Sequence, residues 1–136
     1  MSWNGVKKQV NKAEIEAWCE EMGIQNYTIN SKGEIDVADC IEFEFKKNND
    51  FKELPYKFGE VKGYFSLDGC TNLISLKNCP TKIGNSFYCN DCSQLVSLEG
   101  CPKEVDENFI IRRSKKRFTQ DEIRQKCKVH LKIEIQ

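Results

Sequence analysis

Hydrophobic residues recur along this chain with a fixed spacing of 22 positions. Four phenylalanines keep the spacing: Phe43, Phe65, Phe87 and Phe109. Three further sets share it: Leu54, Leu76 and Leu98; Val61, Ile83 and Val105; and Asn48, Cys70 and Cys92. A fixed period in the twenties with apolar residues in register predicts a solenoid, in which each repeat forms one rung of a stacked array.

Each repeat contains a short segment in which apolar and polar residues alternate, the pattern of a half-buried β-strand. In the segment 86–90 the apolar residues are Phe87 and Cys89. The segment 41–45 alternates in the same way. Its Phe43 and Phe45 precede Phe65 and Leu67 by 22 residues, so the segment is predicted to form the first rung. The residues predicted to point inward from the rung at 83–98 are Ile83, Phe87, Cys89, Cys92, Leu95 and Leu98.

A helix is predicted at 11–22, because apolar residues fall at i, i+3, i+4 and i+7 on one face. These residues are Ile15, Trp18, Cys19 and Met22. Asn11 is expected to cap the helix, Glu14 to complete a capping box, and Val10 to pack on Ile15. Gly23 is the expected left-handed terminator, followed by Ile24 folding back on the last turn.

The segment 27–37 predicts a hairpin in which Gly33 supplies a positive φ. Near the other end, Thr119 and Glu122 predict the capping box of a second helix, onto which Phe118 packs. One more strand is predicted over 129–135, where Val129, Leu131, Ile133 and Ile135 alternate with polar residues. Both helices are expected to cover the exposed ends of the array.

The spacing Phe-x-Cys-x-x-Cys-x-x-Leu that begins at Phe87 approximates the leucine-rich-repeat pattern. The chain resembles bacterial leucine-rich repeats, and more narrowly the small repeat proteins of phages and prophages. The segments that carry the resemblance are 54–63, 70–73 and 97–103. It covers about residues 25–136, and one departure matters. Ile111 and Ser114 replace the repeated cysteines in the last rung, so the array is expected to end there.

The predicted fold class is α/β: a short leucine-rich-repeat-like solenoid of about four 22-residue rungs with parallel strands and a capping helix at each end. We expect one domain over residues 1–136. It would consist of a helix and hairpin at 1–40, the repeat array at 41–116, and a helix and strand at 117–136.

Charge is divided unevenly along a chain whose net charge is zero. Residues 111–136 carry 9 Lys/Arg against 3 Asp/Glu, whereas residues 1–110 carry 12 against 18. The first residues lack the apolar run of a secretory signal, and no stretch reaches the 18 or so apolar residues of a membrane span. Eight cysteines in such a chain indicate reduced thiols in the cytoplasm, with a disulfide scaffold as the weaker alternative.

The pair Cys89 and Cys92 resembles half of a zinc site or a redox dithiol. His130 is the single histidine and no second Cys-x-x-Cys is present, so we expect core thiols and no metal or cofactor. Among the carboxylates at 36–44, Glu42 and Glu44 lie on an open strand face where nothing raises a pKa. The sequence therefore predicts a protein that is not an enzyme.

Stacking the rungs predicts an outward strand face, which solenoids use to hold partners. Its positions are Glu42, Glu44 and Lys46; Tyr64, Ser66 and Asp68; Ser86, Tyr88 and Asn90; Asn108, Ile110 and Arg112. Tyr64 and Tyr88 are the expected anchors, because tyrosine is favoured at interface hot spots. A basic run adjoins this face and contains Arg112, Arg113, Lys115, Lys116 and Arg117.

The predicted function is protein binding without catalysis. The resemblance implies a phage accessory factor in the cytoplasm of a bacterial host, which inhibits a defence protein such as a CRISPR nuclease by occupying its surface. The partner would then be a host protein, in one version a nucleoprotein complex whose RNA contact the basic run mimics or displaces. One alternative is direct nucleic-acid binding through that run. Another is a structural or assembly role in a virion.

Overall fold

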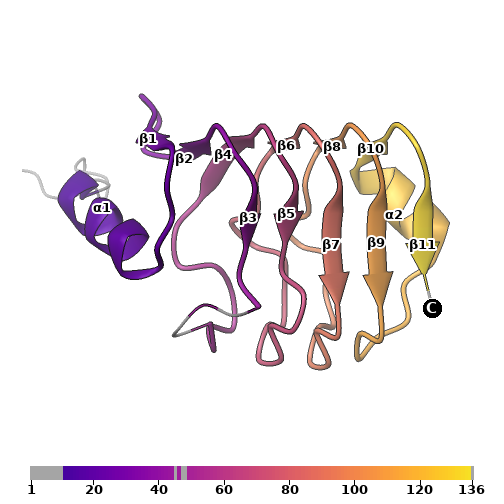
Figure 1. Ribbon diagram of the computed structural model, residues 1–136. Helices are drawn as coiled ribbons and strands as arrows, with labels where there is room; N and C mark the ends of the chain where they lie inside the picture. Colours follow the sequence, from indigo (N-terminus) through magenta and orange to yellow (C-terminus); the bar gives the residue numbers. More distant parts are fainter. Residues whose placement is uncertain (1–10, 45, 47–48, 136) are drawn as a thin grey trace, which may run out of the picture.

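The computed structural model describes residues 11–44, 46 and 49–135. Within them the chain forms a parallel-strand β-solenoid of about four turns together with two helices (Figure 1). Each turn contributes one short strand to each of two sheets. In each turn, the segment that leads from the second strand to the next turn is irregular. Single backbone hydrogen bonds join these irregular segments in successive turns, such as the bond from Val96 N to Ile74 O at 3.1 Å. The predicted solenoid is therefore confirmed.

The first sheet has six strands in the order β1-β2-β4-β6-β8-β10. Their bounds are β1 Tyr27–Ile29, β2 Ile35–Val37, β4 Phe58–Val61, β6 Lys82–Ile83, β8 Glu104–Val105 and β10 Lys128–Val129. The second has five strands in the order β11-β9-β7-β5-β3, with bounds β3 Ile41–Glu42, β5 Phe65–Ser66, β7 Phe87–Asn90, β9 Phe109–Arg112 and β11 Ile133–Ile135. The antiparallel pair β1–β2 forms the predicted hairpin, with Gly33 at a φ of 79°.

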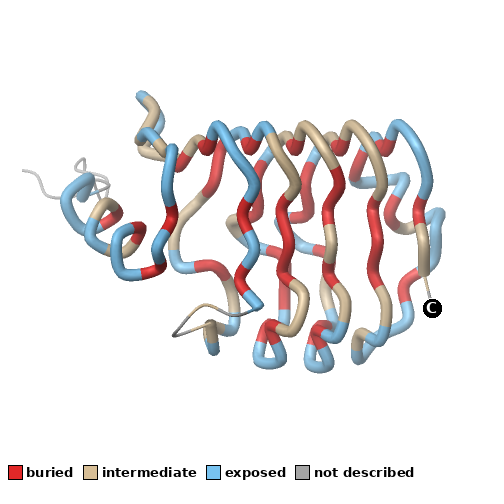
Figure 2. Tube along the Cα trace, viewed as in Figure 1, coloured by how far each residue is buried: buried red, intermediate tan, exposed pale blue. Residues whose placement is uncertain are grey.

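The solenoid core is built on the repeated phenylalanines. Phe43, Phe65, Phe87 and Phe109 are each 0% exposed. Their ring centroids lie 5.8, 6.3 and 4.8 Å apart in succession along the row. Figure 2 shows the same layout, because buried positions recur along the strands of successive turns.

The first rung differs from the predicted register. Ile41 pairs with Phe65, and the Phe43 N–H donates to the carbonyl of Ser66, so the offset is 24 residues and not 22. A shift of two residues preserves the alternation between inward and outward side chains, so Phe43 stays in the core and Glu42 stays outside. Phe45 and Asn48, which were assigned to this rung, lie outside the described residues.

The final predicted strand is also different, because the chain turns a corner in the middle of it. β10 pairs with β8 in the six-stranded sheet, and β11 pairs with β9 in the five-stranded sheet. Leu131, expected to face inward, lies at the corner and is 60% exposed. The segment therefore forms a fifth rung, with Ile133 placed 24 residues after its partner Phe109.

The turn after each strand of the five-stranded sheet repeats one backbone conformation. Gly69, Asp91 and Arg113, spaced by 22, have φ values of 74°, 61° and 59°. This left-handed conformation costs little for glycine and more for other residues. At two of these turns the side chains also interact, because Asp91 and Arg113 form an ion pair with each other.

Helix α1 (Lys12–Glu21) packs beside the first rung with Ile15 and Cys19 buried. Asn11 caps it as predicted, accepting from the Glu14 N–H at 3.1 Å. The Glu14 carboxylate instead accepts a 2.6 Å bond from the Tyr56 hydroxyl, which raises the pKa of Tyr56 to about 12. Val10, expected to staple this helix, lies outside the described residues.

Helix α2 (Gln120–Lys126) lies at the opposite end, beside β10 (Figure 1). Its capping box between Thr119 and Glu122 is complete, as predicted. Phe118, which precedes the helix, and Ile123, which lies within it, are both buried. In the part of the chain described here, no helix has the length and apolar character that crossing a bilayer requires.

The eight cysteines are free thiols, and all except Cys40 are buried. Their spacing predicted core positions for the repeated ones, and Cys70, Cys79, Cys89 and Cys92 are each 1% exposed or less. Burial raises the pKa of the Cys70 thiol to about 12, which keeps it protonated. The Cys89 and Cys92 sulfurs lie 3.2 Å apart, and the Cys92 sulfur also lies 3.2 Å from the carbonyl of Leu67. These thiols behave as small apolar fillers with weak hydrogen bonds.

Candidate functional site

The register of the five-stranded sheet arranges its outward side chains in rows. One row runs through Glu42, Ser66, Tyr88, Ile110 and Glu134. Asn90 stands opposite Arg112 in a neighbouring row. We call this surface the outer face. The outer face contains the strand positions that the sequence predicted. Hydrogen bonds between neighbouring strands hold the backbone of these positions in place.

Two tyrosines form an aromatic pair on the outer face. The rings of Tyr64 and Tyr88 lie 5.9 Å apart at an interplanar angle of 81°, an edge-to-face contact. They approach diagonally, because Tyr88 stands opposite Ser66, whose small side chain leaves room for both rings. The Tyr64 hydroxyl donates to Glu42 Oε1 at 3.3 Å. Partial desolvation, and then the Glu42 charge, raise the pKa of Tyr64, which keeps it a hydrogen-bond donor.

Three residues expected on the outer face are covered by their neighbours. Ser66, Ser86 and Ile110 are only 6%, 1% and 9% exposed. Ser66 Oγ accepts from the Asp68 N–H at 3.2 Å, and Ser86 Oγ accepts from the Asn108 N–H at 3.1 Å. A serine between larger side chains in a ladder has little surface of its own, and Ile110 stands between Tyr88 and Glu134 in its row. These residues therefore support the outer face and offer a partner little contact area.

Three carboxylates lie on the outer face with the tyrosine pair, on the first two rungs. Glu42 and Glu44 are exposed, and Asp68 is half-buried. Asp68 Oδ1 accepts from the Asn90 N–H at 2.6 Å, which fixes the position of that carboxylate. Tyr64, Tyr88, Glu42, Glu44 and Asp68 thus form one acidic and aromatic surface, which we call the tyrosine patch.

The basic run is largely neutralised by carboxylates of the chain itself. Arg112 forms an ion pair with Glu134, and Arg113 forms one with Asp91, whose pKa is lowered by the guanidinium. Both partners lie 22 residues away along the sequence, on the adjacent rung.

A third cation of the run is engaged as well. Lys116 Nζ lies 3.0 Å from Glu122 Oε2 and 5.2 Å from the centroid of the Phe118 ring. Lys115 and Arg117 are exposed, and neither forms an ion pair with any described residue. A polyanion binding here would have to compete with existing carboxylates at three of the five cations.

Sequence reasoning did not place Lys132 and Glu134 on the outer face. The missing step was the pairing of β11 with β9, which puts Glu134 opposite Ile110. The Lys132 N–H donates to Asn108 Oδ1 at 3.1 Å, which extends the neighbouring row into the fifth rung. The alternation over 129–135 indicated a strand, but not the sheet to which each half belongs.

No family model, curated protein or solved structure matches this chain. Its function must therefore be inferred from the geometry and charge of the outer face.

Proposed function

We propose that this protein is a non-catalytic binding module that holds a partner protein on its outer face, with the tyrosine patch as the anchor. The observation that carries the proposal is the edge-to-face pair of Tyr64 and Tyr88 beside exposed carboxylates. Partly exposed tyrosines on a rigid sheet offer large contact area at low entropic cost, and tyrosine is enriched at hot spots. Parallel strands in a solenoid provide such extended surfaces.

The charge of the patch favours a partner that presents lysine or arginine. Glu42 and Glu44 are exposed, and among the described residues Glu42 Oε1 accepts a hydrogen bond from the Tyr64 hydroxyl. Complementary charge at the rim of an interface mainly accelerates association and selects the partner. A guanidinium from the partner could also lie over a tyrosine ring while it pairs with a neighbouring carboxylate.

Helices α1 and α2 would serve this module as caps of a leucine-rich-repeat-like array. A solenoid exposes an apolar rung at each end, and terminal elements with a polar outer side keep it soluble. The contacts of α1 support this role, because Trp18 packs on Phe43 and Phe58 with ring centroids 6.4 and 6.1 Å apart.

The resemblance to phage and prophage repeat proteins supports a biological setting for this binding. The partner would be a bacterial defence protein such as a CRISPR nuclease, inhibited in the host cytoplasm because its surface is occupied. Direct phosphate binding through the basic run is the less favoured mode. Three of its cations, Arg112, Arg113 and Lys116, already have carboxylate partners.

The proposal is tested by comparing variants as bait in host lysates, followed by calorimetry with the partner that is recovered. Tyr64→Ala/Tyr88→Ala should lose the partner while keeping the wild-type melting temperature, because neither ring belongs to the core. Loss of an interface hot spot costs about 2 kcal/mol or more, which corresponds to roughly 30-fold in Kd. Ile74→Ala/Val96→Ala is the matched control, because these residues are 41% and 46% exposed on the irregular side.

Charge variants test the second part of the proposal. Glu42→Gln/Glu44→Gln should slow association with the partner and flatten its salt dependence, whereas Lys115→Gln/Arg117→Gln should leave both unchanged. If the reverse is observed, the basic run is the contact surface. If neither the tyrosine nor the glutamate variants weaken binding, the partner does not use the tyrosine patch.

A further inference from the structure

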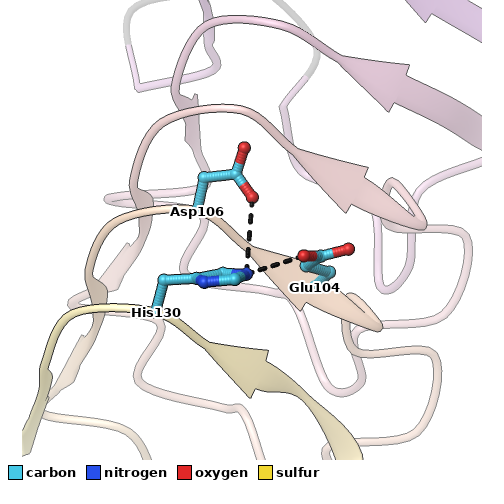
Figure 3. Close-up of side chains that lie close together, drawn as sticks. All are labelled: Glu104, Asp106 and His130. Atoms are coloured by element: carbon cyan, nitrogen blue, oxygen red, sulfur yellow. Dashed lines mark hydrogen bonds and ion pairs between the residues drawn. The ribbon is translucent and has the colours of Figure 1, made fainter.

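A second cluster of polar side chains lies outside the outer face, at the edge of the six-stranded sheet (Figure 3). Glu104 comes from β8, Asp106 from the corner that follows it, and His130 from the corner after β10. His130 Nε2 lies 2.6 Å from Glu104 Oε2 and 3.8 Å from Asp106 Oδ1. One ligand atom from each residue lies within 4.8 Å of the other two.

The sheet register brings these residues together. Val105 pairs with Val129, so the next residues, Asp106 and His130, stand side by side on adjacent rungs. Glu104 is two residues before Asp106 and therefore points to the same side of the strand.

Backbone hydrogen bonds fix the position of each of the three residues. Glu104 N donates to Thr81 O at 3.2 Å, Asp106 N to Ile83 O at 3.0 Å, and His130 N to Val105 O at 3.0 Å. A cluster carried on ladder-bonded backbone is more precisely positioned than one on a free loop.

We propose that Glu104, Asp106 and His130 form a binding site for a divalent transition-metal ion of the zinc class. An imidazole nitrogen with two carboxylate oxygens is a donor set that suits zinc, nickel and cobalt better than magnesium or calcium. Ligands about 2.0–2.2 Å from a tetrahedral zinc ion lie roughly 3.3 Å from each other. The observed separations lie on either side of that value, so small side-chain rotations would form the site. Three protein ligands leave one position for water or for a donor from a partner.

The carboxylates of the site attract a cation, whereas nearby lysine side chains repel it. Glu104 and Asp106 bring two carboxylates to the site. Lys82 Nζ lies 4.0 Å from Glu104 Oε1, and Lys128 adds positive charge nearby. These lysines oppose a metal ion, so removing Lys82 should tighten binding. That result would distinguish a metal site from a histidine–carboxylate ion pair with a structural role alone.

The experiment is a titration of the reduced full chain with Zn²⁺ by calorimetry and with Co²⁺ by absorption spectroscopy. We expect one equivalent to bind, with a cobalt spectrum free of the intense near-ultraviolet band of thiolate ligation. His130→Ala should lower the affinity at least 100-fold, Glu104→Gln and Asp106→Asn each about 10- to 100-fold, and Lys82→Gln should raise it several-fold. Zinc should also raise the melting temperature of the wild type and not of His130→Ala.

Two control variants separate this site from other sources of binding. Glu60→Gln changes a carboxylate in the same strand position two rungs away, and it should bind as the wild type does. Cys40→Ser removes the exposed thiol and should also leave the titration unchanged. Binding that survives His130→Ala, a thiolate band in the Cys40→Ser protein, or no binding up to millimolar metal would each overturn the proposal. Melting curves without metal verify that every variant is folded.

Discussion

Phe87 lies at the centre of the stacked core, and its replacement by alanine tests the rung assignment most directly. The side chain is 0% exposed and lies between the rings of Phe65 and Phe109. One neighbour is stacked at 6.3 Å and 12°, and the other meets it edge-on at 4.8 Å and 61°. Phe87→Ala would therefore leave a cavity bordered by the rungs on both sides.

The expected cost follows from these contacts. Burying a phenylalanine side chain stabilises a protein by about 1.5–3 kcal/mol through transfer from water. Each aromatic pair adds about 0.5–1.5 kcal/mol. The total agrees with the roughly 3–5 kcal/mol measured for such substitutions, and two ring contacts place Phe87 near the upper end. A domain has about 5–15 kcal/mol in all, so the variant should be marginally folded or unfolded.

Thermal and urea denaturation followed by circular dichroism measure this cost. We expect the melting temperature to fall by about 10 °C or more. Phe87→Leu keeps most of the volume and should lose roughly 1.5 kcal/mol. Val96→Ala, at a site that is 46% exposed, is the surface control and should change stability by about 0.5 kcal/mol. A Phe87→Ala protein that melts within about 2 °C of wild type would show that Phe87 is not a central core residue.

Two further predictions concern the thiols and a turn. With Ellman's reagent, one thiol of the native protein, Cys40, should react rapidly, whereas the other seven should react only as the chain unfolds. Several fast thiols, or one that persists in Cys40→Ser, would contradict this burial pattern. Gly100→Ala should destabilise the protein by more than 1 kcal/mol, because φ is 83° and a Cβ would lie 2.3 Å from the Cα of Lys77. An unfolding midpoint for Gly100→Ala equal to that of the wild type would refute the expectation.

The repeat period alone was enough to predict the central rungs. Phe65, Phe87 and Phe109 pair in the register that a 22-residue spacing requires, and the repeated cysteines are buried with them. The local signals of α2 also sufficed, because a capping box depends only on residues three apart. Periodicity and capping are local or regular properties, and a sequence displays them directly.

The register at the two ends of the array could not be predicted from the repeat period. The offsets of 24 residues at Ile41–Phe65 and Phe109–Ile133 keep the inside-outside alternation, so the hydrophobic pattern does not distinguish them from offsets of 22. The ion pairs of Arg112 and Arg113 were accessible in principle, because each partner lies one period away. The cluster at His130 required the offset at the last rung, which only the fold specifies.

The arrangement of the rungs also determines how the protein would respond to a pulling force. Helix α1 lies at one end of the solenoid and β11 at the other, so tension applied between them acts along the stacking axis (Figure 1). The ladder hydrogen bonds between neighbouring strands run along that same axis. Such a load opens one interface between rungs at a time, whereas a load along the strands would shear a whole ladder at once. Under tension between its ends the molecule would therefore lengthen in steps of one rung, each releasing a loop of chain about as long as the repeat.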